Sequence, residues 1–246
     1  MTVNSEEDIK KLFAAGKVVR GAFERMKQAA RAGVSTGELD ALGGQYLKNH
    51  GARSAPQLYY DFPGATCISV NTEAAHGIPG PRLLADGDMV NIDVSAELDG
   101  YVADMGESFV VGKGTPAQVQ ICYAVQAAVK AAIGKIRSGR SLNVIGKAVQ
   151  KMADKFGYEI VRNLGSHGVG NSIHEEPSYV PLDNPSERRR LDEGLVLTIE
   201  PFFSTGANWV EEQDDGWTLS VPEGDLVAQF EQTLIVTRRG ALVVTA

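Results

Sequence analysis

The chain has 246 residues, with 24 lysine and arginine residues against 31 aspartate and glutamate residues and a formal net charge of −7. This acidic excess argues against a nucleic-acid site, and a hydrophobic content of 43% is ordinary for a folded protein with a sizeable core. Two cysteines build no disulfide framework, and neither a signal peptide nor an apolar run of about 18 residues is visible, so we expect a cytoplasmic protein without a membrane span.

The beginning of the chain carries two helical patterns. Ser5 is a candidate N-cap, Asp8 lies three residues later, and apolar residues then recur with helical period until Gly33 offers a stop. A second helix is expected over residues 35–50, because Gly51 follows as a natural end.

A strand pattern replaces the helical one at residue 89. Polar and apolar residues alternate over residues 89–98, and Asp99-Gly100 is a strong two-residue hairpin turn. Residues 101–111 continue as a second strand. The sequence therefore predicts an antiparallel hairpin in which Leu98 pairs with Tyr101.

The register of this hairpin brings two carboxylates together. Asp93 lies opposite Gly106, and Asp104 lies opposite Ser95, when Asp99-Gly100 forms the loop. Because side chains alternate along a strand, Asp93 and Asp104 share one face as diagonal neighbours about 7–8 Å apart. A cation can be bound between such residues, although a half-exposed hairpin with a solvated polar face explains the same pattern.

The second half of the chain repeats the order of the first. Two helices are expected over residues 116–137 and 141–156, followed by strands over residues 158–162, 195–203, 226–237 and 242–244. Four residues of the first half recur 106 positions later: Arg31, Gly33, Ser35 and Gly51 return as Arg137, Gly139, Ser141 and Gly157. We interpret this as an internal duplication that packs as one domain with a site between two similar halves.

Two further acidic residues lie in strand patterns that are otherwise apolar. They are Glu200 and Glu231, and neither has an obvious basic partner beside it in the sequence. Acidic residues in buried strands are rare unless they are paired or bind metal. One such residue would fit an edge strand, but two of them, together with Asp93 and Asp104, predict a shared acidic centre. Two divalent cations would neutralise the four charges.

Three of the four histidines lie in glycine- and proline-rich segments. His76 and His167 are each followed by glycine, and His174 comes seven residues after His167. Pro177 occupies the place of the second histidine of a His-Glu-x-x-His motif, so His174 does not begin the helical zinc site of that class. His50 ends a helix pattern, and we interpret it as structural.

Six segments combine these residues into a larger pattern: Cys67–Pro79, Val90–Val94 with Asp104, Gly165–Gly170, His174–Pro177, Thr198–Pro201 and Ala228–Thr233. Together they resemble the type I methionine aminopeptidases of the pita-bread fold, in the order of that family and over nearly the whole chain. The resemblance implies an α+β fold of two pseudo-symmetric halves, each helix–helix–strand–strand, with an antiparallel sheet inside and helices outside. It also implies a single catalytic metallopeptidase domain over residues 1–246.

The same resemblance assigns two divalent metal ions to the acidic centre. Asp93 would bind one ion, Asp104 and Glu231 would bridge both, and His167 and Glu200 would complete the other site. Carboxylates and one imidazole without a thiolate suit Mn, Fe(II), Co or Zn.

Three residues receive catalytic roles from the resemblance. Glu200 would take up the proton of the attacking water, and His174 would polarise the scissile carbonyl and steady the oxyanion. His76 would form a hydrogen bond at the scissile amide nitrogen, so His76 and His174 would also bind the substrate.

The expected methionine pocket departs from the family pattern. Residues that match pocket positions in relatives are Tyr59, Phe62, Cys67 and Trp217. Ile173 stands where relatives usually have phenylalanine, and further departures are Tyr60-Asp61, Gly64-Ala65 and Ala75. A change of one apolar residue in a pocket is worth about 1–3 kcal/mol, which alters efficiency without abolishing activity.

The resulting hypothesis is removal of the initiator methionine from nascent polypeptides with a small second residue, by a cytoplasmic monomer. Its partner would be a peptide or nascent-chain N-terminus, and ribosome association is left open.

One alternative is a proline-directed aminopeptidase or dipeptidase on the same fold, whose members generally carry an additional N-terminal domain. The others are a weakly active regulatory paralogue and a metal-free binding module, although all five metal ligands are present. Only 26 positions separate His174 from Glu200, which leaves no room for the helical insertion of type II enzymes.

Overall fold

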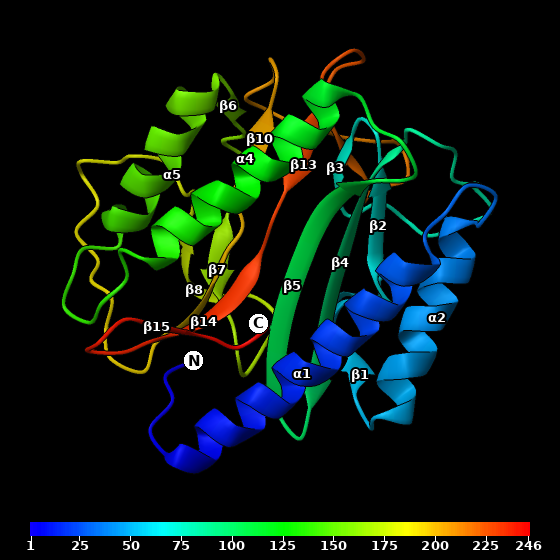
Figure 1. Ribbon diagram of the computed structural model, residues 1–246. Helices are drawn as coiled ribbons and strands as arrows, with labels where there is room; N and C mark the ends of the chain where they lie inside the picture. Colours follow the sequence, from blue (N-terminus) through cyan, green and yellow to red (C-terminus); the bar gives the residue numbers. More distant parts are fainter.

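The structure, a computed structural model, describes all 246 residues of the chain. Its helices are α1 (Glu6–Ala29), α2 (Thr36–Asn49), α3 (Ala55–Tyr60), α4 (Pro116–Ile133) and α5 (Asn143–Phe156). The four long helices lie over the strands, α1 and α2 over one half of the molecule and α4 and α5 over the other (Figure 1). No helix combines the length and the apolar character needed to cross a membrane.

Helix α1 begins where the sequence predicts. The Ser5 hydroxyl accepts a hydrogen bond from the N–H of Asp8, and the Asp8 carboxylate accepts one from the N–H of Ser5, so the capping box is complete. Helix α2 begins with the same device, formed by Ser35 and Glu38. These two starts are confirmed because the bonds that fix them are local in the sequence.

The predicted ends of two helices are wrong. Helix α1 stops at Ala29 and not at Gly33, because the N–H of Gly33 donates to the carbonyl of Leu84 at 2.8 Å and so leaves the helix. Helix α4 stops at Ile133 and not at residue 137, and the chain then turns to bury Ile136 in the core. After α4 the chain continues through local turns, in which the N–H groups of Lys135 and Ile136 donate to the carbonyls of Ala132 and Ile133.

The start of α5 also differs from the duplicated pattern. Ser141 is the counterpart of Ser35, yet the N-cap position is Leu142, which makes no side-chain capping bond. The Ser141 hydroxyl instead accepts from the N–H of Asn143 at 3.2 Å. The repeated sequence therefore gives the same helix order in both halves but not the same cap.

Four sheets are arranged behind these helices. A four-stranded sheet holds β4 (Met89–Leu98) between β1 (Arg53–Ser54), β2 (Cys67–Val70) and β5 (Tyr101–Val110). A five-stranded sheet has the order β15 (Ala241–Val243), β14 (Gln232–Val236), β9 (Val196–Ile199), β7 (Ser166–Gly168) and β8 (Glu175–Tyr179). The two smaller sheets are β13 (Val227–Gln229), β10 (Phe202–Ser204) and β6 (Glu159–Ile160), and β11 (Glu211–Glu212), β12 (Leu219–Ser220) and β3 (Glu73–Ala75).

The β4–β5 hairpin has the predicted register. Leu98 pairs with Tyr101, Asp93 with Gly106, and Asp104 with Ser95. Asp99 and Gly100 both have positive φ, 52° and 86°, as the two central positions of a type I′ turn require. The register prediction is confirmed, and it places Asp93 and Asp104 on the face of the hairpin that meets the second half of the chain.

Two predicted strands are interrupted at an acidic residue. The segment 195–203 divides into β9 and β10 around Glu200, and the segment 226–237 divides into β13 and β14 around Glu231. At each break the chain passes from one sheet to another, since β9 and β14 belong to the five-stranded sheet and β10 and β13 to a three-stranded one. Pro201 contributes to the first break because it has no N–H for a ladder.

Two large hydrophobic clusters and a third of seven residues form the core. The larger has 28 buried residues and packs α1 and α2 against the apolar face of the hairpin, where Val90, Ile92 and Val94 are fully buried. The second has 22 buried residues and packs α4 and α5 against the strands of the second half. The polar face of the hairpin is left between the two clusters, and the site forms there.

Candidate metal centre

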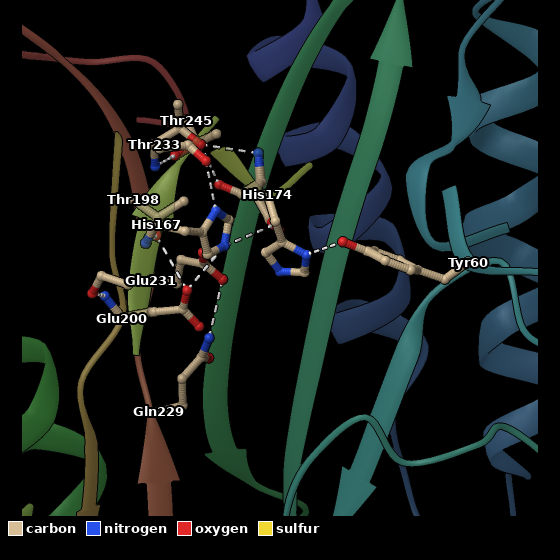
Figure 2. A network of polar contacts seen from close by, with 12 residues as sticks. Tyr60, His167, His174, Thr198, Glu200, Gln229, Glu231, Thr233 and Thr245 are labelled. Carbon is tan, nitrogen blue, oxygen red and sulfur yellow. Dashed lines mark hydrogen bonds and ion pairs between the residues drawn. The ribbon is translucent and has the colours of Figure 1, made fainter. Parts of the chain in front are cut away.

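Four acidic residues meet one histidine between the halves. Asp93 and Asp104 extend from adjacent strands, β4 and β5, of the first half. Glu200 and Glu231 come from the two sheet crossings of the second half, and His167 comes from β7. Asp104, His167, Glu200 and Glu231 are between 1% and 8% exposed, and Asp93 is half-buried. Figure 2 shows His167, Glu200 and Glu231 converging beside the hairpin strands.

The sheet crossings orient the two glutamates. The N–H of Glu231 donates to the carbonyl of Gly106 at 2.8 Å, which fastens this residue to the hairpin. The N–H of Glu200 donates to the Ser166 hydroxyl at 2.9 Å, and the Thr198 hydroxyl donates to Glu200 Oε1 at 3.1 Å. Both carboxylates are therefore held toward the gap between the halves instead of lying along a continuous strand.

His167 presents one free nitrogen to this gap. Its Nδ1 lies 2.9 Å from the Gly168 carbonyl, which can only accept, so Nδ1 carries the hydrogen. Nε2 then faces Glu200 Oε1 at 3.1 Å and Asp104 Oδ2 at 3.9 Å. Burial acts to lower the pKa of His167, but the neighbouring Glu200 carboxylate raises it above its usual value. A ring that donates Nδ1–H to a backbone carbonyl is the usual arrangement of a metal-binding histidine.

The carboxylates repel one another in the absence of a cation. Burial, followed by the charges of their acidic neighbours, raises the pKa values of Asp104 and Glu231 well above their usual range. Burial and the charge of Glu200 also raise the pKa of Asp93 to about 7. Charge of this density is stable in a protein interior only when it is protonated or neutralised by cations.

Two buried oxygen atoms identify where a cation fits. Asp104 Oδ1 and Glu231 Oε1 are buried and accept no hydrogen bond. One ligand atom each of Asp104, His167 and Glu231 can be chosen so that all lie within 4.8 Å of one another. Buried polar atoms without partners are rare in native proteins, and a metal ion would satisfy both oxygens. The residues present therefore fit a divalent metal.

A set of polar residues supports the ligands, and our sequence reasoning missed it. Gln229 Nε2 donates to Glu231 Oε2 at 3.1 Å, and Asn91 Nδ2 donates to Gln229 Oε1 at 2.8 Å. The Thr198 hydroxyl likewise donates to Oε1 of Glu200. Asn91, Thr198 and Gln229 each precede an acidic ligand by two positions. Since strand side chains repeat with period two, a polar residue two positions before three of the four acids was the available signal.

His76 and His174 line a cavity together with metal-ligand candidates. A cavity of about 440 Å³ is bounded by His76, His174, His167, Asp93 and Glu200, among others. The rings of His167 and His174 lie edge to face, with centroids 4.3 Å apart. Burial lowers the pKa of His76, and lowers that of His174 to about 4, where basic neighbours add to the effect. Both histidines are therefore neutral at neutral pH.

The residues predicted to form the methionine pocket lie in several parts of the first and second halves. Phe62 and Trp217 form an edge-to-face pair with ring centroids 5.1 Å apart. Cys67 is buried opposite Asp93 across β2 and β4. Ile173 belongs to the larger hydrophobic cluster, and Tyr59 packs against that cluster. None of these residues bounds the 440 Å³ cavity, so their role as a methionine pocket stays a prediction.

Comparison with known proteins gives the chain its family. The sequence model of metallopeptidase family M24 matches residues 10–238. The chain belongs to this family. It is 40% identical to the methionine aminopeptidase 2 of Bacillus subtilis strain 168, over 100% of this chain and 99% of that protein. The predicted metal-dependent aminopeptidase is confirmed.

Solved structures of M24 proteins confirm the fold. The methionine aminopeptidase of Rickettsia prowazekii matches with a TM-score of 0.95 and 33% identity, over 100% of both chains. The prolidase of Pyrococcus furiosus matches with a TM-score of 0.80 and 24% identity, but this chain covers only 65% of it. The α+β pita-bread architecture predicted from the sequence is therefore correct, and the prolidase likeness concerns the fold alone.

Proposed function

We propose that this M24 protein removes N-terminal methionine from polypeptides whose second residue is small. The observation that carries the proposal is the pair of buried, unpaired oxygens of Asp104 and Glu231. One ligand atom of each of these residues lies within 4.8 Å of a ligand atom of His167, and His167 bounds a cavity of about 440 Å³. A structural ion pair would leave no such oxygens. The relatives named methionine aminopeptidase, aligned over the full chain, supply the substrate class.

The five residues would hold two divalent ions. Asp93 would bind one ion, His167 and Glu200 the other, and Asp104 and Glu231 both. Four carboxylates and one neutral imidazole balance the charge of two such ions, which is the reason for proposing two. Oxygen and imidazole ligands without a thiolate suit Mn, Fe(II), Co or Zn.

When bound by these residues, divalent ions would supply Lewis acidity and, by lowering the pKa of water from 15.7 toward about 7, a nucleophile at neutral pH. Glu200 would accept the proton that water loses as it attacks the scissile carbonyl. His174, neutral at this pH, would donate a hydrogen bond to the developing oxyanion. His76 would bind at the scissile nitrogen, which becomes the new amino group. Each of these side chains lines the cavity of about 440 Å³ that Asp93 and His167 also bound.

The methionine side chain would lie against the aromatic pair of Phe62 and Trp217, with Tyr59, Cys67 and Ile173 completing the pocket. Phe62 and Cys67 are buried, which suits an apolar side chain. We infer that residues 1–246 act as a single catalytic domain, as a cytoplasmic monomer on the N-termini of peptides and nascent chains. A direct contact with the ribosome is not required for this chemistry.

The test is release of the first residue from matched peptides. Purified protein, loaded anaerobically with Mn or Fe(II), should release methionine from Met-Gly-X and leave Leu-Gly-X largely intact. An X-Pro peptide is the third substrate, because cleavage there would favour the proline-directed alternative. Binding of fewer than two ions per chain would contradict the proposed ligand set, and absence of methionine release with both ions bound would contradict the substrate.

A further inference from the structure

Tyr60, for which the sequence predicted no role in the site, contacts His174. The hydroxyl oxygen of Tyr60 lies 2.6 Å from Nδ1 of His174, and the two rings are tilted by 46° with centroids 5.4 Å apart. Tyr60 is the last residue of α3 in the first half of the chain, and His174 directly precedes β8 in the second. Figure 2 shows Tyr60 approaching His174 from the side opposite to His167 and Glu200.

This bond is the one hydrogen bond that the His174 side chain makes within the protein. A neutral imidazole carries a single hydrogen, so the bond decides which ring nitrogen has it. The phenol hydroxyl is the stronger acid and the imidazole nitrogen the stronger base. The hydroxyl of Tyr60 should therefore donate to Nδ1, which leaves the hydrogen on Nε2.

The position of Tyr60 is fixed by its own helix. Helix α3 ends at Tyr60, and Asp61 takes a left-handed conformation with φ of 54° while its N–H donates to the Pro56 carbonyl. The neighbouring Tyr59 hydroxyl donates to the carbonyl of Asn171 at 3.1 Å. Two consecutive tyrosines thus contact the segment that carries His174. Tyr59 bonds to the backbone of that segment, and Tyr60 bonds to the histidine ring.

We propose that Tyr60 is a positioning residue that holds His174 with its hydrogen on Nε2 and directs that N–H away from α3, toward the reacting carbonyl. The proposal rests on the role proposed above for His174. In the alternative tautomer Nε2 would be an acceptor, and it would repel an oxyanion instead of stabilising it. Tyr60 itself would not touch the substrate carbonyl.

The first experiment observes the tautomer without any reaction. Metal-free protein labelled with ¹⁵N at histidine is studied by NMR at pH 7.5, and the His174 signals are assigned by their loss in His174→Gln. We expect Nε2 to be protonated and Nδ1 to be an acceptor in the wild type. In Tyr60→Phe we expect both nitrogens to shift toward the averaged values of a mobile imidazole. A wild-type His174 with its hydrogen on Nδ1 would overturn the proposal.

The second experiment separates positioning from binding. Loss of a group that donates to the oxyanion lowers kcat by about 10²–10³. Loss of a residue that only positions this group should have a smaller effect. We therefore expect Tyr60→Phe to lower kcat about tenfold. KM for a Met-Gly-X peptide should stay within about twofold, since the methionine pocket is unchanged. The matched control is Tyr123→Phe, which removes a hydroxyl from an exposed tyrosine on α4 and should leave both constants unchanged.

The outcomes distinguish this proposal from the proposed function. An unchanged kcat in Tyr60→Phe, or a rise in KM alone, would reject a positioning role. A wild-type enzyme that releases no methionine would reject the proposed function, while the NMR measurement would still decide the tautomer. Because Tyr60 is 44% exposed, loss of its hydroxyl removes little buried contact, and both variants should fold.

Discussion

Replacing Gly106 by alanine should disturb the metal centre without touching a metal ligand. Gly106 lies on β5 opposite Asp93, and its carbonyl accepts the N–H of Glu231 at 2.8 Å. A Cβ at this position would lie 2.6 Å from Nε2 of Gln229, and closer still to its Oε1. The site therefore has no room for a methyl group unless the Gln229 side chain moves.

The size of the disturbance follows from these distances. Ordinary contact begins near 3.4 Å, so the Gln229 amide must shift by about 1 Å, and its 3.1 Å bond to Glu231 cannot survive that movement. Overpacking of this kind costs about 1–3 kcal/mol of unfolding free energy. Loss of a residue that orients a metal ligand lowers metal affinity about 10–100-fold, and we expect Gly106→Ala to fall in this range.

Titration calorimetry with Mn under anaerobic conditions measures the affinity, and thermal unfolding of the metal-free protein measures the stability. The matched control is Gly134→Ala, because a Cβ there would meet its nearest atoms at 3.5 Å and 3.8 Å, an ordinary contact. The control should keep wild-type affinity. Wild-type metal affinity in Gly106→Ala, with a folded protein, would refute the reasoning that Gln229 positions Glu231.

Three further changes test separate parts of the argument. Asp104→Asn should lower turnover at saturating metal by several orders of magnitude with little loss of fold, and near-normal turnover would contradict its role as a bridging ligand. Burial raises the pKa of Cys122 from 9.0 to about 12, so the unfolded chain loses this proton first and stability falls as pH rises through that window. Urea unfolding should therefore show that the wild type loses more unfolding free energy between pH 8 and pH 10.5 than Cys122→Ala does. The difference should be at most about 1.4 kcal/mol per pH unit. Equal losses in the two proteins would count against a buried neutral thiol. Ser35→Ala should cost about 1 kcal/mol in the same assay because it removes the cap of α2, and an unchanged midpoint would mean that this cap adds nothing.

Local signals in the sequence determined a large part of this protein. Ser5 and Ser35 each act on N–H groups a few residues away, so the starts of α1 and α2 could be predicted. Asp99-Gly100 and the alternation around it determined the register of the hairpin, and hence that Asp93 and Asp104 share a face. These features were predictable because each depends on a turn or a period contained within about 20 residues.

The acidic centre was visible for a different reason. Glu200 and Glu231 stand among apolar residues, and the cost of burying a charge makes such residues unusual wherever they occur. The sequence could therefore indicate that carboxylates converge, although the roles of the individual ligands remain predictions. It could not indicate that both glutamates lie at breaks between strands, because each break depends on which sheet the next strand joins.

Only the tertiary structure decided the contacts between the halves. The hydroxyl of Tyr60 reaches His174 across 114 residues, and Asn91 reaches Gln229 across 138 residues. No turn, cap or period links residues so far apart, and their distance is set by the packing of two helix pairs on different sheets. The sequence thus determined the elements and the identity of the charged residues, while packing decided which side chains orient them.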